Sequence, residues 1–185
     1  MSAPTLPKTV TYEEGLEMPE VEDGREEVVH GEIIRMPPNK WNHAQTIEEL
    51  AGVLRRQLPK KEVWVVTSNF GLVIRREPLT SRTPDLAVIR RSTLLEQDGY
   101  IHSAPELIVE VLSPSNTRRQ MEHKIRDYES IGVPELWILS GEARTFEVFQ
   151  LQDGKLRRTQ LLAEGELRPK CFPEAVVDIT SVWPD

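Results

Sequence analysis

The chain has 185 residues, of which 38% are apolar and 29% are charged, a composition typical of one soluble globular domain with an ordinary core. Its 23 basic and 30 acidic side chains give a net charge of −7, which excludes a protein that holds nucleic acid mainly by diffuse positive charge but not one with a locally basic cleft. Because Cys171 is the only cysteine, a disulfide framework and a thiolate metal cluster are also excluded.

The chain carries no pattern typical of membrane insertion or secretion. No apolar run approaches the roughly 18 residues that span a bilayer, and residues 1–8 lack the basic and apolar segments of a signal peptide. We therefore expect one cytoplasmic domain over residues 1–185, with an N-terminal arm at 1–24, a core at 25–150 and a C-terminal β extension at 151–185.

The first half of the chain is predicted to form a helical turn, a β-hairpin, one helix and three strands. His30-Gly31 separates two β-branched runs, a pattern typical of a hairpin turn. Apolar residues then recur at helical spacing until Pro59 ends the helix, and the runs of Val and Ile that follow indicate an antiparallel meander. In chain order these elements cover residues 12–16, 26–36, 41–58, 62–69, 71–76 and 83–90.

The second half begins with the most strand-like segment of the chain, ELIVEVL at residues 106–112. We expect Ser115 or Asn116 to cap a helix that reaches Ile131, with Gly132 as its C-terminal stop. A strand, a hairpin and one short strand follow, over residues 135–139, 144–162 and within 171–183. This order predicts an α/β domain around a mixed central sheet flanked by helices, with extra β-hairpins at both ends.

Two carboxylates lie where a purely structural pattern would not place them. Asp85 follows Pro84 at the beginning of a predicted strand, although Pro-Asp is also a common turn pair. Glu110 lies within a strand whose two faces are both largely apolar, which is typical of a central strand covered on both sides. An ionised carboxylate at that position is costly unless it is paired or bound to a metal ion.

Lys124 is the one charged residue on the apolar face of the predicted second helix. On a helical wheel it lies among Met121, Ile125 and Tyr128, whereas the other charged residues of the helix lie on the opposite side. Its ammonium group could extend outward to solvent. It could equally reach Glu110, because a tight strand-turn-helix connection joins the two residues.

A carboxylate pair with an inward-pointing lysine is the minimum set for metal-assisted phosphodiester hydrolysis. Asp85 and Glu110 supply the hard oxygen ligands that Mg²⁺ or Mn²⁺ prefers. Lys124 could orient or help deprotonate the attacking water, and its charge would complement the scissile phosphate. The alternative is structural: a buried Glu110–Lys124 ion pair, with Asp85 in an unrelated turn.

Several ordered motifs resemble one large bacterial protein family. They are VHGEII at 29–34, PDLAV at 84–88, PELIVEVLSPS at 105–115, GVPELWI at 132–138, and the single residues Lys124 and Tyr128. Over about residues 25–150 the chain resembles the restriction-endonuclease-like family abundant in cyanobacteria and the Deinococcus–Thermus group, which is part of the PD-(D/E)xK nuclease superfamily.

This resemblance implies a restriction-endonuclease-like fold, Mg²⁺- or Mn²⁺-dependent hydrolysis of DNA, and three catalytic residues. Asp85 matches the aspartate of the superfamily motif and Glu110 its second acid, so both would bind the metal. The motif's lysine position is occupied by Leu112. In this family the lysine is found on the following helix, where Lys124 is the matching residue, in agreement with the helical wheel.

Three further residues are secondary candidates for the site. Superfamily nucleases often carry another acid near the start of the domain, for which Glu32 and Glu48 are rivals. His43 lies at the start of the first helix and could contact the catalytic residues without itself binding the metal ion. We also expect a possible homodimer, since two active sites would cut both strands of a duplex. The rival to an enzyme is an inactive nuclease fold that acts as a nucleic-acid or protein interaction module.

Overall fold

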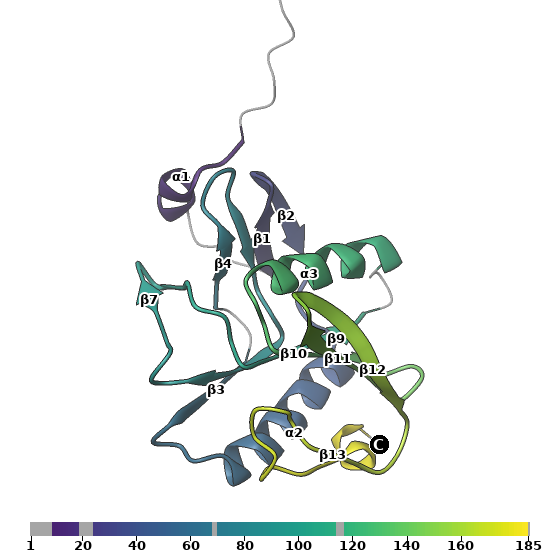
Figure 1. Cartoon of the computed structure of the whole chain (residues 1–185). Coiled ribbons are helices and arrows are strands. Elements are labelled where there is room, and N and C mark those ends of the chain that lie inside the picture. Colours follow the sequence, from purple (N-terminus) through teal and green to yellow (C-terminus); the bar gives the residue numbers. More distant parts are fainter. Residues whose placement is uncertain (1–8, 19–23, 68–69, 114–116, 185) are drawn as a thin grey trace, which may run out of the picture.

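The computed structural model describes residues 9–18, 24–67, 70–113 and 117–184, and its centre is a mixed six-stranded sheet (Figure 1). The strand order of this central sheet is β12-β11-β10-β9-β6-β3. Only β9 and β10 run parallel, and every other neighbouring pair is antiparallel. Its strands are β3 (Val63–Thr67), β6 (Leu86–Arg90), β9 (Leu107–Leu112), β10 (Glu135–Ser140), β11 (Thr145–Gln152) and β12 (Lys155–Leu162).

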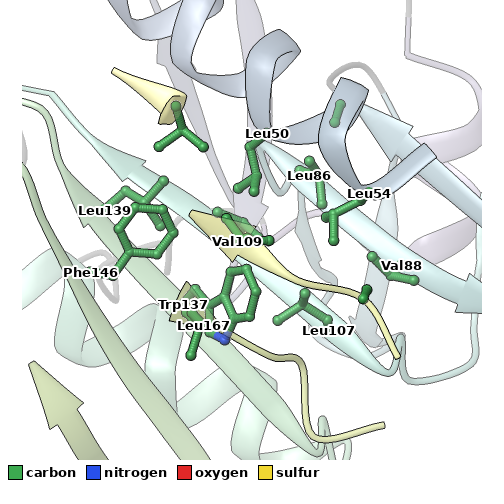
Figure 2. Close-up of a cluster of buried hydrophobic side chains, with 14 of the residues drawn as sticks. Leu50, Leu54, Leu86, Val88, Leu107, Val109, Trp137, Leu139, Phe146 and Leu167 are labelled. Carbon is green, nitrogen blue, oxygen red and sulfur yellow. The ribbon is translucent and has the colours of Figure 1, made fainter. Parts of the chain in front are cut away.

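The two long helices cover opposite faces of the central sheet, α2 (Trp41–Gln57) on one face and α3 (Arg118–Ser130) on the other. Because side chains alternate along a strand, β9 sends Leu107 and Val109 toward α2 and Ile108 toward α3. Figure 2 shows Leu50 and Leu54 of α2 on the same side of the sheet as Leu107 and Val109. The predicted α/β class, with its mixed central sheet flanked by helices, is therefore confirmed.

A second sheet packs at one end of the molecule and was not predicted. Its strand order is β2-β1-β5-β4-β8-β7. It consists of β1 (Arg25–Val29), β2 (Glu32–Met36), β4 (Leu72–Arg75), β5 (Thr80–Arg82), β7 (Glu96–Gln97) and β8 (Tyr100–Ile101). The hairpin predicted over 26–36 forms its β1 and β2, and the turn residues His30 and Gly31 have φ of 53° and 80°, as a tight hairpin turn requires.

The antiparallel meander predicted over residues 62–90 is wrong in its pairing. β3 pairs with β6, while β4 pairs with β5, so strands adjacent in sequence belong to different sheets. The sequence conceals this because residues 80–82, Thr-Ser-Arg, carry no apolar strand pattern and were not predicted as a strand. Once β5 pairs with β4 and β1, β6 is left to join β3 in the central sheet.

The two ends of α3 follow ordinary capping chemistry, whereas Lys40 caps α2 without a side-chain hydrogen bond. Thr117 is the N-cap of α3 and forms a capping box with Gln120. The caps expected at Ser115 or Asn116 lie outside the described residues. Gly132, at φ +80°, follows the helix as predicted. The helical turn predicted over residues 12–16 is present as α1 (Tyr12–Leu16).

The C-terminal region closes the α2 side of the core. β13 (Glu166–Leu167) pairs with β14 (Val177–Asp178), and a 3₁₀-helix, η1 (Ile179–Val182), follows. Leu167, Ile179 and Val182 belong to the same buried cluster as α2. None of the helices in the described ranges is long and apolar enough to cross a membrane.

We predict that Phe146→Ala lowers the free energy of unfolding by about 3–5 kcal/mol, because truncation of a buried aromatic ring leaves a cavity. Phe146 is fully buried, with its ring edge-on to Trp137 and Trp183 at centroid distances of 5.9 and 5.5 Å. Leu161→Ala on the neighbouring strand is the control, since that side chain is 58% exposed and its loss changes stability by less than about 0.5 kcal/mol. Urea denaturation followed by circular dichroism measures both. Equal losses would contradict this account of the core.

Candidate active site

The pairing of β6 with β9 brings Asp85 and Glu110 together. Leu86 lies opposite Val109, so Asp85, one residue earlier, lies beside Glu110 where the two antiparallel strands meet. The backbone N–H of Val111 donates to Asp85 Oδ2 over 2.8 Å. Both residues are buried: Asp85 is 1% exposed and Glu110 is 3% exposed. Two residues 25 positions apart thus form one acidic pair.

Lys124 reaches this pair from α3. Its Nζ donates to Glu110 Oε2 over 2.8 Å, as the helical wheel allowed, and the ammonium group is buried rather than directed to solvent. The other oxygen of Glu110 accepts a short hydrogen bond from the Tyr128 hydroxyl one turn further along the same helix. Both carboxylate oxygens of Glu110 are therefore held by one face of α3.

Glu27 on β1 is a third buried acid, and sequence reasoning missed it. Its Oε1 lies 3.2 Å from Lys124 Nζ, and its Oε2 accepts from Arg82 Nη1 at 2.7 Å. Arg82 in turn donates to Asp127 of α3. Residues 27–29 of β1 are all buried, so buried and exposed side chains do not alternate along this strand. A period-two pattern in the sequence therefore could not identify Glu27 as a buried acid. The only available signal was an acid next to two valines.

Asp85 is surrounded by cationic and imidazole groups. Arg25 Nη1 donates to Asp85 Oδ1 over 2.5 Å, and His43 Nε2 lies 3.2 Å from the same oxygen. Arg25 is itself oriented by Asn39, whose Oδ1 accepts from Nη2 at 2.8 Å. The structure thus places His43, a secondary candidate, in contact with the acidic pair through the first turn of α2.

The other two secondary candidates lie elsewhere. Glu32 is exposed at the beginning of β2, and Glu48 is an exposed residue of α2 that pairs with Arg55 over 3.4 Å. Neither lines the cleft into which Asp85 and Glu110 face. Glu27 is the further acid that the tertiary structure brings to this position.

Burial and neighbouring charges move the pKa values of the three acids in different directions. Burial raises the pKa of Glu110, the carboxylates of Asp85 and Glu27 raise it further, and Lys124 only partly offsets them. Burial would also raise the pKa of Asp85 and of Glu27. For Asp85, the nearby His43 imidazole and the charge of Arg25 outweigh it, so its pKa is lowered. For Glu27, the cations Lys124 and Arg82 do the same.

The basic and phenolic partners have raised pKa values. Burial would lower the pKa of Lys124, but the carboxylates of Glu110, Glu27 and Asp85 outweigh it, so the ammonium form is favoured. Burial and the Glu110 carboxylate raise the pKa of Tyr128 well above its ordinary value, so its hydroxyl stays protonated and remains a donor to Glu110.

The acids face a cleft of about 1110 Å³ between β2, the first turn of α2 and the N-terminal half of α3. Six basic residues line the cleft against four acidic ones, so its wall carries an excess of positive charge although the chain as a whole is acidic. The basic residues are Arg25, Arg35, Lys40, Arg82, Lys124 and Arg144. The acidic ones are Glu27, Asp85, Glu110 and Glu142.

The donor set of Asp85 and Glu110 fits a divalent cation that also takes ligands from a substrate. Among the described residues, no three His, Cys, Asp or Glu side chains come together as a preformed metal centre. Mg²⁺ does not require one, because it usually keeps several waters and takes one or two carboxylates together with substrate phosphates. Two adjacent carboxylates that line a cleft meet that requirement once Arg25 leaves Asp85 and Lys124 or Tyr128 leaves an oxygen of Glu110.

Comparisons with known proteins place this geometry in context. Residues 12–180 match the model of the Uma2 family, whose description is "Putative restriction endonuclease". A crystal structure from Anabaena variabilis, described as "a putative nuclease belonging to DUF820", superposes with a TM-score of 0.77 at 21% sequence identity, over 94% of this chain and 97% of that one. No curated protein matches the chain. The structural likeness shows a shared fold.

We predict that Glu27→Gln lowers the free energy of unfolding near pH 7 by about 3 kcal/mol, because it leaves buried cations with one partner fewer. Since the pKa of Glu27 is lowered from 4.5, its stabilising contribution is complete above pH 4.5 and is lost as the pH falls through the folded-state pKa. The difference between wild type and variant therefore shrinks below pH 4.5. Denaturant titrations across the acid range measure it.

The matched control is Glu26→Gln, one residue earlier on β1. The Glu26 side chain is 11% exposed, but its partner Arg35 is 76% exposed and stays hydrated when the carboxylate is removed, so this variant loses less stability than Glu27→Gln. If the two variants lose the same stability, or if the Glu27 difference does not depend on pH, the account of Glu27 as a buried ion-pair partner fails.

Proposed function

The chain belongs to the Uma2 restriction-endonuclease family, and from that premise we propose that it is an endonuclease that hydrolyses phosphodiester bonds of DNA with a bound Mg²⁺ or Mn²⁺. The observation that carries the proposal is that Asp85, Glu110 and Lys124 line one cleft. Lys124 Nζ donates to Glu110, and Asp85 accepts from the backbone N–H of Val111, the residue after Glu110. Asp85 precedes β6, Glu110 lies in β9 and Lys124 in α3, so the fold brings them together from separate parts of the chain. An ion pair that served only stability would not need to line a cleft.

The charge of the cleft supports a polyanionic substrate. Its lining carries six basic and four acidic residues, in contrast to the net charge of −7 of the whole chain. Arg35, Lys40 and Arg144 lie at the cleft and can contact phosphates of the strand on either side of the scissile one. This local excess of positive charge removes the main argument from composition against a nucleic-acid ligand.

In the proposed reaction the chain's own groups position the phosphate and the water. Asp85 and Glu110 would hold the metal ion, which supplies charge stabilisation at the phosphate and lowers the pKa of a water. Lys124 stays protonated and complements the charge that develops on the phosphate oxygens. His43 and the Val111 N–H keep the Asp85 carboxylate oriented, and Tyr128 does the same for Glu110.

Arg25 favours a second candidate, an inactive nuclease fold that binds a nucleic acid or a protein without cutting it. Its guanidinium group already neutralises Asp85, and the other acid is held by Lys124 and Tyr128. If these contacts persist, the carboxylates cannot take up a cation. Metal affinity therefore separates the two candidates before any cleavage is measured.

We predict that Glu110→Gln abolishes both metal binding and the nicking of supercoiled plasmid, because the amide cannot replace a charged metal ligand. Isothermal titration calorimetry with Mg²⁺ and Mn²⁺ and a plasmid-nicking assay measure the two effects. Glu48→Gln is the control, since Glu48 is exposed and does not line the cleft, and it keeps both properties. If the wild-type protein binds neither ion at millimolar concentration and nicks no plasmid, the second candidate, an inactive nuclease fold that binds without cutting, is supported instead.

We predict that Lys124→Met slows nicking by about 100-fold or more while metal ions still bind, because the lysine acts on the charge of the phosphate rather than on the metal. Methionine keeps much of the apolar length of the side chain, so α3 can still pack. Comparison of the calorimetric affinity with the nicking rate separates the two roles. Loss of metal binding in this variant would show instead that Lys124 only holds the acids in place.

A further inference from the structure

Trp41 is the most exposed large apolar side chain among the described residues, at 78% exposure. Its ring makes no aromatic or cation–π contact within the described part of the chain. Trp64 provides a contrast, because it is 41% exposed and the Arg91 guanidinium covers its ring at 3.6 Å from the centroid. A single exposed apolar side chain is common on protein surfaces, but an uncovered indole offers both an apolar face and an N–H donor to a ligand.

The position of Trp41 connects it with the cleft. It is the first residue of α2, and its neighbours on both sides, Lys40 and Asn42, line the cleft while the indole lies outside the lining. His43, two residues later, reaches Asp85 over 3.2 Å. The first turn of α2 therefore carries both the imidazole that contacts Asp85 and the exposed ring of Trp41.

The dimensions of the cleft restrict what can reach the acids. Its volume of about 1110 Å³ is close to the roughly 300–1,000 Å³ of sites that enclose small ligands. Asp85 and Glu110 lie at the bottom, only 1% and 3% exposed. A phosphate on the outside of a rigid duplex does not enter such a cleft easily, whereas a flexible single strand can bend a phosphate inward.

An exposed indole beside a basic cleft is the combination by which proteins bind single-stranded nucleic acid. Basic residues contact the backbone, and aromatic rings stack on unpaired bases whatever their sequence. Lys40, the residue before Trp41, and Arg35 both line the cleft and supply positive charge. A duplex offers no free base face to Trp41, because its bases stack on one another.

We propose that the cleft binds a single-stranded segment of nucleic acid and that an unpaired base next to the scissile phosphate stacks on Trp41. The inference rests on the proposed nuclease function and specifies its substrate as DNA with an unpaired stretch. The Trp41 ring fixes the register of the strand, and the basic cleft wall draws the adjacent phosphate toward Asp85 and Glu110.

The experiment measures the binding of a short fluorescein-labelled oligothymidine by fluorescence anisotropy in EDTA, with the same strand annealed to oligoadenine for comparison. Wild type is expected to bind the single strand more tightly than the duplex. Trp41→Ala weakens single-strand binding by about 10-fold, and Trp41→Phe, which keeps an aromatic face, stays within about 2-fold of wild type. Trp64→Ala is the matched control, because its ring is already covered, and it binds like wild type.

Intrinsic fluorescence gives a second readout that a merely structural role would not produce. Stacking of a base quenches the indole of Trp41, so titration with unlabelled oligothymidine lowers the emission of wild type and of Trp64→Ala. The quenching disappears in Trp41→Phe although that variant still binds. Binding without any quenching in wild type would place the base elsewhere and overturn the proposal.

Three other results would overturn it. Trp41→Ala could bind the single strand as tightly as wild type, or wild type could prefer the duplex. Alternatively, sedimentation velocity could show a dimer that Trp41→Ala dissociates, which would assign the ring to an interface between two copies. Binding is measured without divalent cations, so these results are independent of nicking. A protein that does not nick but binds through Trp41 contradicts only the nuclease proposal. A protein that nicks but whose binding does not change in Trp41→Ala contradicts only this inference.

Discussion

The arrangement of the site depends on the burial of one carboxylate, that of Glu110, in the central strand of the sheet. A buried charge is tolerated only when neighbouring groups compensate it. Lys124 and Tyr128 do so from α3, and this fixes which face of the helix meets the sheet. Glu27 then becomes necessary as a second partner for Lys124, and Arg82 as a partner for Glu27. One charge in a strand thus organises a helix and two strands of the second sheet.

This network does not bring every acid to the same state. Glu110 keeps a raised pKa because it is buried and because two other carboxylates lie nearby. The pKa values of Asp85 and Glu27 are lowered by neighbouring arginine, lysine and histidine side chains. A site that is already close to neutral has little need of a cation for stability. Any gain from a divalent ion would therefore come from a substrate phosphate that binds with it, which agrees with the positive lining of the cleft.

The contrast between the whole chain and the cleft shows why net charge is a weak guide to a partner. The sum of −7 comes mostly from exposed acids spread over the surface, whereas six basic residues gather at the cleft. At physiological ionic strength the field of an exposed charge falls off within about 8 Å. A ligand in the cleft therefore experiences the local charges more strongly than the total.

The sequence by itself determined the elements whose signals are local. The apolar period of residues 41–58 and of the second helix, the alternation along 106–112, and the turn residues at His30-Gly31 predicted α2, α3, β9 and the first hairpin. It also identified Asp85, Glu110 and Lys124 as candidates, because each is a charge in an apolar pattern. Such misplaced charges are visible without coordinates, since burial follows from periodicity.

Only the tertiary structure decided how these residues meet. The alternation of side chains along a strand does not specify which other strand it pairs with. The separation of β3 and β4 into different sheets therefore could not be predicted. The same holds for Glu27, which contacts Lys124 97 positions away, and for Arg25, which contacts Asp85 60 positions away. His43 was a candidate from the sequence, but only the structure shows that its partner is Asp85. The physical reason is that local patterns report whether a side chain is buried, whereas its partners depend on which surfaces the chain packs together.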